Sequence, residues 1–128
     1  MFGEHGLPLM GVGDWNDGMN LVGADGRGES VWLGWFIIDI LNRFETNCTK
    51  QGDTKRIAIY AKKREELTEA LSEHGWDGQW YRRAFTDSGQ WLGSIHNEEC
   101  QIDAIAQSWS VISKGAPKER AIQAMKFI

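Results

Sequence analysis

The sequence contains little cysteine and little histidine, and neither residue shows the pattern of a metal site. Cys48 and Cys100 are the two cysteines among 128 residues, and there are three histidines. The cysteines lack metal-ligand spacing, so free thiols in a reducing compartment are the default expectation, with a disulfide left open. No histidine has a carboxylate partner at helical spacing. We therefore expect no metal centre.

Positive charge is also scarce. Lys and Arg number 14 against 18 Asp and Glu, which gives a net charge of −4 at pH 7. The basic residues are spread thinly rather than gathered in a patch. The sequence therefore offers no electrostatic footprint for nucleic acid or for an anionic membrane, and a neutral substrate fits the charge balance better.

Long hydrophobic runs, leader segments and internal repeats are absent. The longest apolar cluster extends from Val31 to Leu41, is interrupted by Gly34 and Asp39, and is too short to span a bilayer. Residues 1–6 lack the basic region and apolar core of a signal peptide. With 41% hydrophobic and 25% charged residues, the composition predicts a soluble globular segment without direct membrane contact.

Polar chemistry is concentrated in residues 11–20, GVGDWNDGMN. Two carboxylates, two carboxamides, one tryptophan and three glycines stand in these ten positions, a composition that suits neither a helix nor a strand. The stretch therefore predicts a loop. In an extended segment Asp14 and Asn16 would point one way, and Trp15 and Asp17 would share the opposite face.

An aromatic ring beside a carboxylic acid is the pattern of a sugar-cleaving site. The ring of Trp15 would stack on the C–H face of a sugar, while Asp17 would protonate the departing glycosidic oxygen. An ordinary turn explains the same Asp and Asn residues equally well. A calcium loop fits poorly, because Met19 occupies the position of the turn glycine and Asp25 that of the final glutamate.

Apolar periodicity predicts a mostly helical chain. After a loop over 1–29, helices are expected over about 31–47, 53–74, 100–113 and 117–128. Ser30 and Asp53 are suited to cap the first two, and Gly75 and Gly115 to end the second and third. The helix over 31–47 is apolar around most of its circumference, so it has to be covered on most sides.

A short β-hairpin is expected over about 79–94. An aromatic-rich run ends at Phe85, a turn follows at residues 87–89, and a second strand follows that turn. Arg82 and Arg83 on this hairpin are candidates to contact sugar hydroxyls or phosphate. Surface arginines are the more common alternative.

Residues 4–10, leading into the run 13–20, resemble the catalytic loop of glycoside hydrolase family 94, the inverting disaccharide phosphorylases. Residues 26–36 and 108–113 resemble the C-terminal, phosphorylase-like region of cyclic β-1,2-glucan synthases. The resemblance implies that Asp17 is the general acid and Trp15 the neighbouring sugar-site aromatic. It also implies a set of candidate substrate-binding residues: Asp14, Trp15, Asn16, Arg82, Glu98, Glu99, Asp103 and Gln107.

The same resemblance implies a fold. The chain is similar to a fragment of an (α/α)6 barrel of the six-hairpin glycosidase type, with a short β-hairpin. Four helices supply only about a third of such a barrel, and the last helix stops without a cap. We therefore expect a segment of a larger protein, one that contacts the rest of its parent barrel and that can self-associate through its apolar helix.

The resemblance further implies inverting phosphorolysis or transfer at β-glucosidic bonds. Asp17 would protonate the glycosidic oxygen while inorganic phosphate, the co-substrate, attacks the anomeric carbon from the opposite face, with no cofactor. The substrate would be a β-glucan or glucosyl oligosaccharide. The family's phosphate-binding residues lie outside this chain, so the isolated segment is expected to be inactive. Its expected location is the cytoplasm, or the cytoplasmic side of a bacterial inner-membrane protein.

Two alternatives remain open at this point. An inverting hydrolase on the same barrel would require a second carboxylate as base, and Glu98 or Glu99 are the local candidates. A non-catalytic glucan-binding or structural segment would retain sugar stacking on Trp15 without a need for Asp17.

Overall fold

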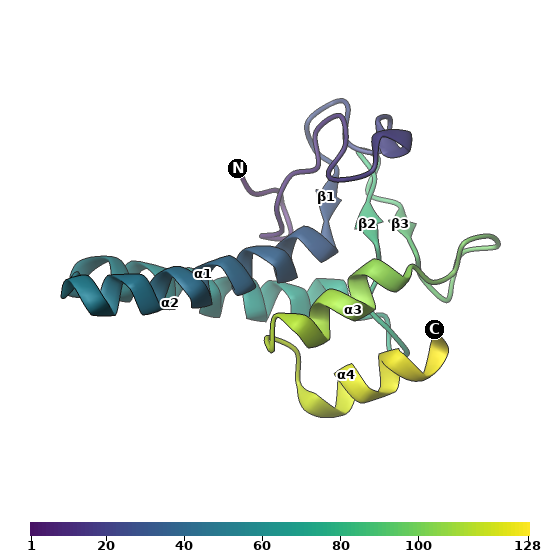
Figure 1. Ribbon diagram of the computed structural model, residues 1–128. Coiled ribbons are helices and arrows are strands. Elements are labelled where there is room, and N and C mark those ends of the chain that lie inside the picture. The colour runs from purple at the N-terminus through teal and green to yellow at the C-terminus, as the bar shows by residue number, and fades with distance from the viewer.

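Two long helices dominate the chain. A computed structural model describes residues 1–128. Helices α1 (Val31–Gln51) and α2 (Thr54–Ala70) form an antiparallel hairpin that extends away from a small sheet (Figure 1). Two shorter helices, α3 (Ala104–Ile112) and α4 (Lys118–Ala124), pack beneath the sheet end of this hairpin in the same view. The mostly helical class predicted from the sequence is confirmed.

The ends of α1 and α2 follow the capping chemistry of the sequence. The Oγ atom of Ser30 accepts a hydrogen bond from the Leu33 amide at the start of α1. Gly52 ends α1 in the left-handed conformation, with φ of 68°. Asp53 then caps α2 by accepting from the Arg56 amide at 3.0 Å. Helix α1 extends beyond the predicted end at residue 47, because Gly52 supplies the left-handed stop.

Only part of α1 lies in the core. Val31, Trp35 and Ile38 are buried, whereas Phe44 on α1 and Ile59 on α2 are exposed near the far end of the hairpin. The expected cover on most sides of α1 is therefore present only over its first half, where α2 and α3 pack against it.

The sheet has three short antiparallel strands in the order β1 (Glu29–Ser30), β2 (Ala84–Phe85) and β3 (Trp91–Leu92). Strands β2 and β3 form a hairpin inside the predicted range 79–94, although each has only two residues. Strand β1 pairs Ser30 with Ala84 and was not expected, because residue 29 was assigned to the loop. The strand that pairs with β1 is distant in the sequence, so no local pattern predicts β1.

Two predicted helices have different boundaries in the structure. The helix expected over 100–113 begins only at Ala104, because Cys100 is left-handed with φ of 50° and Asp103 is extended and caps the helix. The helix expected over 53–74 ends at Ala70 and continues as one π-helical turn, η2 (Leu71–Gly75). The helix expected over 117–128 is α4 followed by a 3-10 turn, η3 (Met125–Phe127).

Gly75 and Gly115 do not end helices through a left-handed conformation, contrary to the prediction. Neither has a positive φ, and Lys114 is the left-handed residue after α3. Both glycines instead permit close packing. A Cβ atom on Gly115 would lie 2.9 Å from the ring of Trp35, and one on Gly75 would lie 3.3 Å from Val31.

Candidate active site

The predicted catalytic loop lies at the end of the sheet opposite the helices. It closes with a 3-10 turn, η1 (Asp17–Met19), drawn in purple near the top of Figure 1. Asn16 caps this turn, since its Oδ1 accepts a hydrogen bond from the Gly18 amide at 2.9 Å. Trp15 is 63% exposed, and Asp17 is also exposed. The aromatic ring and the acid are thus both accessible to a substrate.

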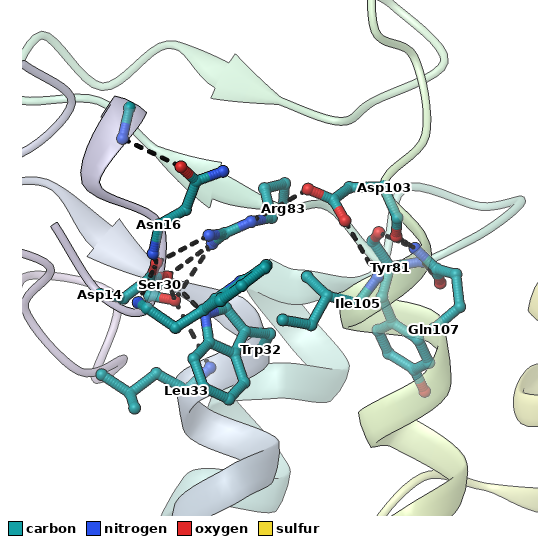
Figure 2. A network of polar contacts seen from close by, with 12 residues as sticks. Asp14, Asn16, Ser30, Trp32, Leu33, Tyr81, Arg83, Asp103, Ile105 and Gln107 are labelled. Atoms are coloured by element: carbon teal, nitrogen blue, oxygen red, sulfur yellow. Dashed lines mark hydrogen bonds and ion pairs between the residues drawn. The ribbon is translucent and has the colours of Figure 1, made fainter. Parts of the chain in front are cut away.

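Asp14 has the opposite environment, because its side chain has no exposed surface. Its Oδ2 atom accepts hydrogen bonds from the Ser30 hydroxyl at 2.8 Å and from the Trp32 indole N–H at 2.5 Å. Arg83 adds two contacts of 2.8 Å, one to each carboxylate oxygen. Figure 2 shows these three side chains converging on Asp14. The loop is therefore attached to the body of the molecule at this carboxylate.

Arg83 occupies the centre of the network. Its Nε lies 3.1 Å from a carboxylate oxygen of Asp103, at the start of α3 (Figure 2). Its backbone N–H donates to the Leu92 carbonyl at 2.7 Å, and its carbonyl accepts from the Val31 amide at 3.2 Å. A Cβ atom on Gly93 would lie only 2.8 Å from the Cβ of Arg83. Backbone and side chain together fix the position of this guanidinium.

The network holds Asp14 as a carboxylate. Burial raises the pKa of Asp14, but the hydrogen bonds from Arg83, Ser30 and Trp32, together with the Arg83 charge, outweigh burial. The pKa of Asp14 falls from 3.8 to about 2. Asp14 is consequently ionised at neutral pH.

The expected alternation along the loop is wrong for one pair. Asp14 and Asn16 were predicted to point the same way, yet Asp14 is buried and Asn16 is exposed. The reason is local, because the backbone bends at Asp14 and Asn16 turns its side chain back to cap η1. The buried Asp14 carboxylate is accordingly out of reach of a sugar in this conformation.

Gln107, a predicted substrate-binding residue, lies inside the fold. It is fully buried, with its Oε1 accepting from the Tyr81 amide at 2.8 Å and its Nε2 donating to the Tyr81 carbonyl at 2.6 Å. Figure 2 shows this paired contact beside Asp103. Gln107 satisfies the backbone of an irregular segment and presents no exposed polar atom to a ligand.

The arginines of the hairpin are buried, so the alternative of two surface arginines is wrong. Arg82 donates to the carbonyls of His74 and Trp76, at 2.6 and 3.1 Å, and its guanidinium lies 4.3 Å from the centre of a Trp91 ring. Burial lowers the pKa of Arg82. Its hydrogen-bonding capacity is directed mainly into the fold rather than toward a substrate.

The structure brings two of the predicted acidic residues close to the loop. Glu99 and Asp103 line a cavity of about 330 Å³ together with Met19 of η1 and with Arg83. Glu98 is exposed and does not line this cavity. No group of three or more His, Cys, Asp or Glu side chains is arranged to hold a metal ion.

Sequence reasoning missed Ser30 and Trp32 as partners of Asp14. They lie 16 and 18 residues away along the chain, and Ser30 was interpreted as a helix cap alone. A buried aspartate needs hydrogen-bond donors from elsewhere in the fold. The sequence around residue 14 does not indicate that its side chain is buried, so these donors could not be predicted from it.

Comparison with known proteins decides the family. The sequence matches the catalytic domain of the Glycosyl hydrolase 94 superfamily over residues 1–128. The chain belongs to this family. The resemblance found in the sequence is thereby confirmed, and membership in family 94 is consistent with a fragment of an (α/α)6 barrel.

Individual family 94 relatives include a synthase and several phosphorylases. The chain is 50% identical over 126 residues to the cyclic beta-(1,2)-glucan synthase NdvB of Rhizobium meliloti (strain 1021), covering 98% of this chain and 4% of the synthase. It is 35% identical over 130 residues to a solabiose phosphorylase of Paenibacillus borealis, covering 98% and 16%. It is 31% identical over 117 residues to an N,N'-diacetylchitobiose phosphorylase of Vibrio proteolyticus, covering 90% and 14%. The chain thus spans a small part of each relative.

None of the helices combines the length and the apolar character that crossing a membrane requires.

Both cysteines are free, with Cys48 buried in α1 and Cys100 exposed.

Proposed function

We propose that this chain carries the general-acid loop of a family 94 enzyme acting on β-linked glucosyl units, with Asp17 as the acid. The observation that carries the proposal is the contrast within the loop. Trp15 and Asp17 are exposed, whereas the Asp14 side chain is fully buried. Three hydrogen bonds, one each from Ser30, Trp32 and Arg83, hold that carboxylate together with a second ion-pair contact from Arg83. A fixed loop that presents a ring and an acid suits a sugar site.

The reaction we propose is inverting phosphorolysis. Asp17 donates its proton to the glycosidic oxygen as the bond from that oxygen to the anomeric carbon breaks. An oxygen of inorganic phosphate attacks the anomeric carbon from the opposite face, which yields a sugar 1-phosphate and a shortened glucan. Phosphate is already a nucleophilic anion, so the step requires no second carboxylate as base and no cofactor.

Trp15 has a binding role in this proposal. Its exposed indole stacks on the C–H face of the sugar next to the scissile bond. Asn16 supports the site indirectly by capping η1. Glu99 and Asp103, which line the cavity beside η1, are the acidic residues best placed to contact a second sugar, and Glu98 on the adjoining exposed segment is the weaker candidate.

We also propose that the rest of the active site comes from further parts of a barrel. The relatives are much longer than this chain, and the 128 residues contain only four α-helices. The isolated chain is then inactive. Mixing it with phosphate and a β-1,2-glucan releases no sugar 1-phosphate, and measurable release would contradict this part of the proposal.

The deciding experiment uses the complete protein that contains these residues. Wild type and Asp17→Asn are incubated with a β-1,2-glucan, with and without phosphate, and sugar 1-phosphate is quantified. Loss of a general acid predicts a fall of about 100-fold or more for Asp17→Asn. Asp25→Asn, at an exposed aspartate on the connector to β1, is the matched control and retains wild-type rate.

Two outcomes would overturn the proposal. Equal rates for wild type and Asp17→Asn would make residues 11–20 a turn without catalytic function. Free glucose formed at the same rate without phosphate would identify a hydrolase instead.

A further inference from the structure

Among residues 11–20, only Asp14 is hydrogen-bonded to the rest of the fold. The remaining hydrogen bonds of this stretch stay between Met10 and Val22. Val12 is 74% exposed, and Trp15 has most of its surface in solvent. Backbone hydrogen bonds hold the two ends of the loop, from the Met10 amide to the Gly28 carbonyl and from the Asp87 amide to the Val22 carbonyl. Between these ends, the Asp14 carboxylate is the hydrogen-bonded attachment of the loop to the rest of the fold.

That carboxylate contacts both the loop and the body of the molecule. Its Oδ1 accepts from the backbone N–H of Trp15 at 2.7 Å as well as from Arg83. Its Oδ2 accepts from Ser30 and Trp32 and lies 2.8 Å from Nη1 of Arg83. The first contact fixes the backbone at Trp15, two residues before Asp17, and the others come from β1, α1 and the residue preceding β2.

Arg83 extends this attachment to α3. It bridges Asp14 and Asp103, while its own backbone is hydrogen-bonded to Leu92 and Val31 on either side. The planar guanidinium of Arg83 has one nitrogen 2.8 Å from each oxygen of Asp14, and such a paired contact fixes direction as well as distance. The loop is consequently aligned with the sheet and with the first turn of α3.

We propose that Asp14 is a positioning residue, which aligns Asp17 for proton transfer by holding its loop to Arg83, Ser30 and Trp32. Asp14 itself does not touch the substrate. Its catalytic consequence rests on the function proposed above. A displacement of about 1 Å at a reacting group lowers a rate by on the order of 100-fold. Loss of the Asp14 attachment would displace Asp17 and therefore slow proton transfer to the glycosidic oxygen.

The substitution Asp14→Asn tests the role with little change in volume. Asparagine has one acceptor oxygen where the network requires two, and its NH2 group would face donors of Arg83 or Trp32. The readout compares two substrates of the complete protein. A β-1,2-glucan has a sugar leaving group that requires protonation, whereas β-glucosyl fluoride releases fluoride with little need of an acid.

The expected result is a difference between the substrates. Asp14→Asn lowers kcat/KM for phosphorolysis of the glucan by about 10- to 100-fold and lowers that of β-glucosyl fluoride by less than about 3-fold. A loss of folded enzyme would lower both equally. Asp87→Asn is the matched control, because Asp87 also fixes a loop by accepting from backbone amides, those of Asp25, Arg27 and Gly28. This control shows no difference between the substrates.

A second variant covers the case in which Asp14→Asn does not fold. Trp32→Phe keeps an aromatic ring in the core and removes the indole N–H that contacts Asp14, together with one ring of an indole that lies near Phe36 and Trp109. We expect Trp32→Phe to lower kcat/KM for the glucan about 3- to 10-fold more than it lowers kcat/KM for β-glucosyl fluoride.

The outcomes separate this inference from the proposed function. Equal losses on both substrates, or no loss, for Asp14→Asn and Trp32→Phe would overturn the positioning role. Asp17→Asn is measured in parallel. If Asp17→Asn shows the preference for fluoride and the other two variants do not, the general acid stands and only the positioning role fails. If Asp17→Asn lowers kcat/KM equally for both substrates, or lowers neither, Asp17 is not the general acid and the proposed function is wrong.

Discussion

Acid should weaken the fold through Asp14. The pKa of this residue is about 2 in the folded chain against 3.8 for the free side chain. A depressed folded-state pKa means that the carboxylate stabilises the fold fully above about pH 5, and that this contribution is lost as the pH falls through 4 toward 2. The difference between the two pKa values corresponds to about 2 kcal/mol of unfolding free energy.

Asp14→Asn isolates this contribution because asparagine does not titrate. At pH 7 the variant is expected to be about 3 kcal/mol less stable than wild type, since it disrupts a buried ion pair. Between pH 6 and pH 2 the difference in unfolding free energy shrinks by about 2 kcal/mol. Urea unfolding followed by tryptophan fluorescence, at a series of pH values for both proteins, measures it. The pH-dependent contributions of the other carboxylates are the same in both proteins and therefore cancel in this difference.

One result would refute the reasoning. If the difference between wild type and Asp14→Asn stays constant from pH 6 to pH 2, Asp14 is not held as a carboxylate by Arg83, Ser30 and Trp32. A direct check is the carboxyl-carbon NMR titration of Asp14, which is expected to give a midpoint near pH 2 and not near 3.8.

Two further predictions concern packing around the site. Gly93→Ala should cost about 2–4 kcal/mol, because the new Cβ lies 2.8 Å from Arg83; Gly89→Ala, at a similar positive φ in open space, should cost only about 1 kcal/mol. Equal urea midpoints for these two variants would contradict the close contact. Gln107→Leu should cost at least about 2 kcal/mol by leaving the Tyr81 amide and carbonyl unpaired. Gln101→Leu, at an exposed glutamine, should cost less than about 1 kcal/mol in the same urea experiment.

The sequence was sufficient for the parts of the fold that depend on local chemistry. Ser30 and Asp53 cap helices because a side-chain oxygen reaches an amide three residues later, a relation visible in the sequence. The loop at residues 11–20 follows from its glycine, Asn and Asp content. Strand β1 could not be predicted, since two residues become a strand only when a distant segment pairs with them.

The site divides in the same way. The sequence by itself determined the helical class, the family and the neighbourhood of Trp15 and Asp17, because those depend on residue order and short-range spacing. Only the tertiary structure decided that Asp14 is buried while Asp17 is exposed, and that Gln107 and Arg82 are directed inward. Burial of a polar side chain requires donors and acceptors from distant segments, and for Asp14 the fold supplies them by bringing Arg83 and Trp32 to one carboxylate.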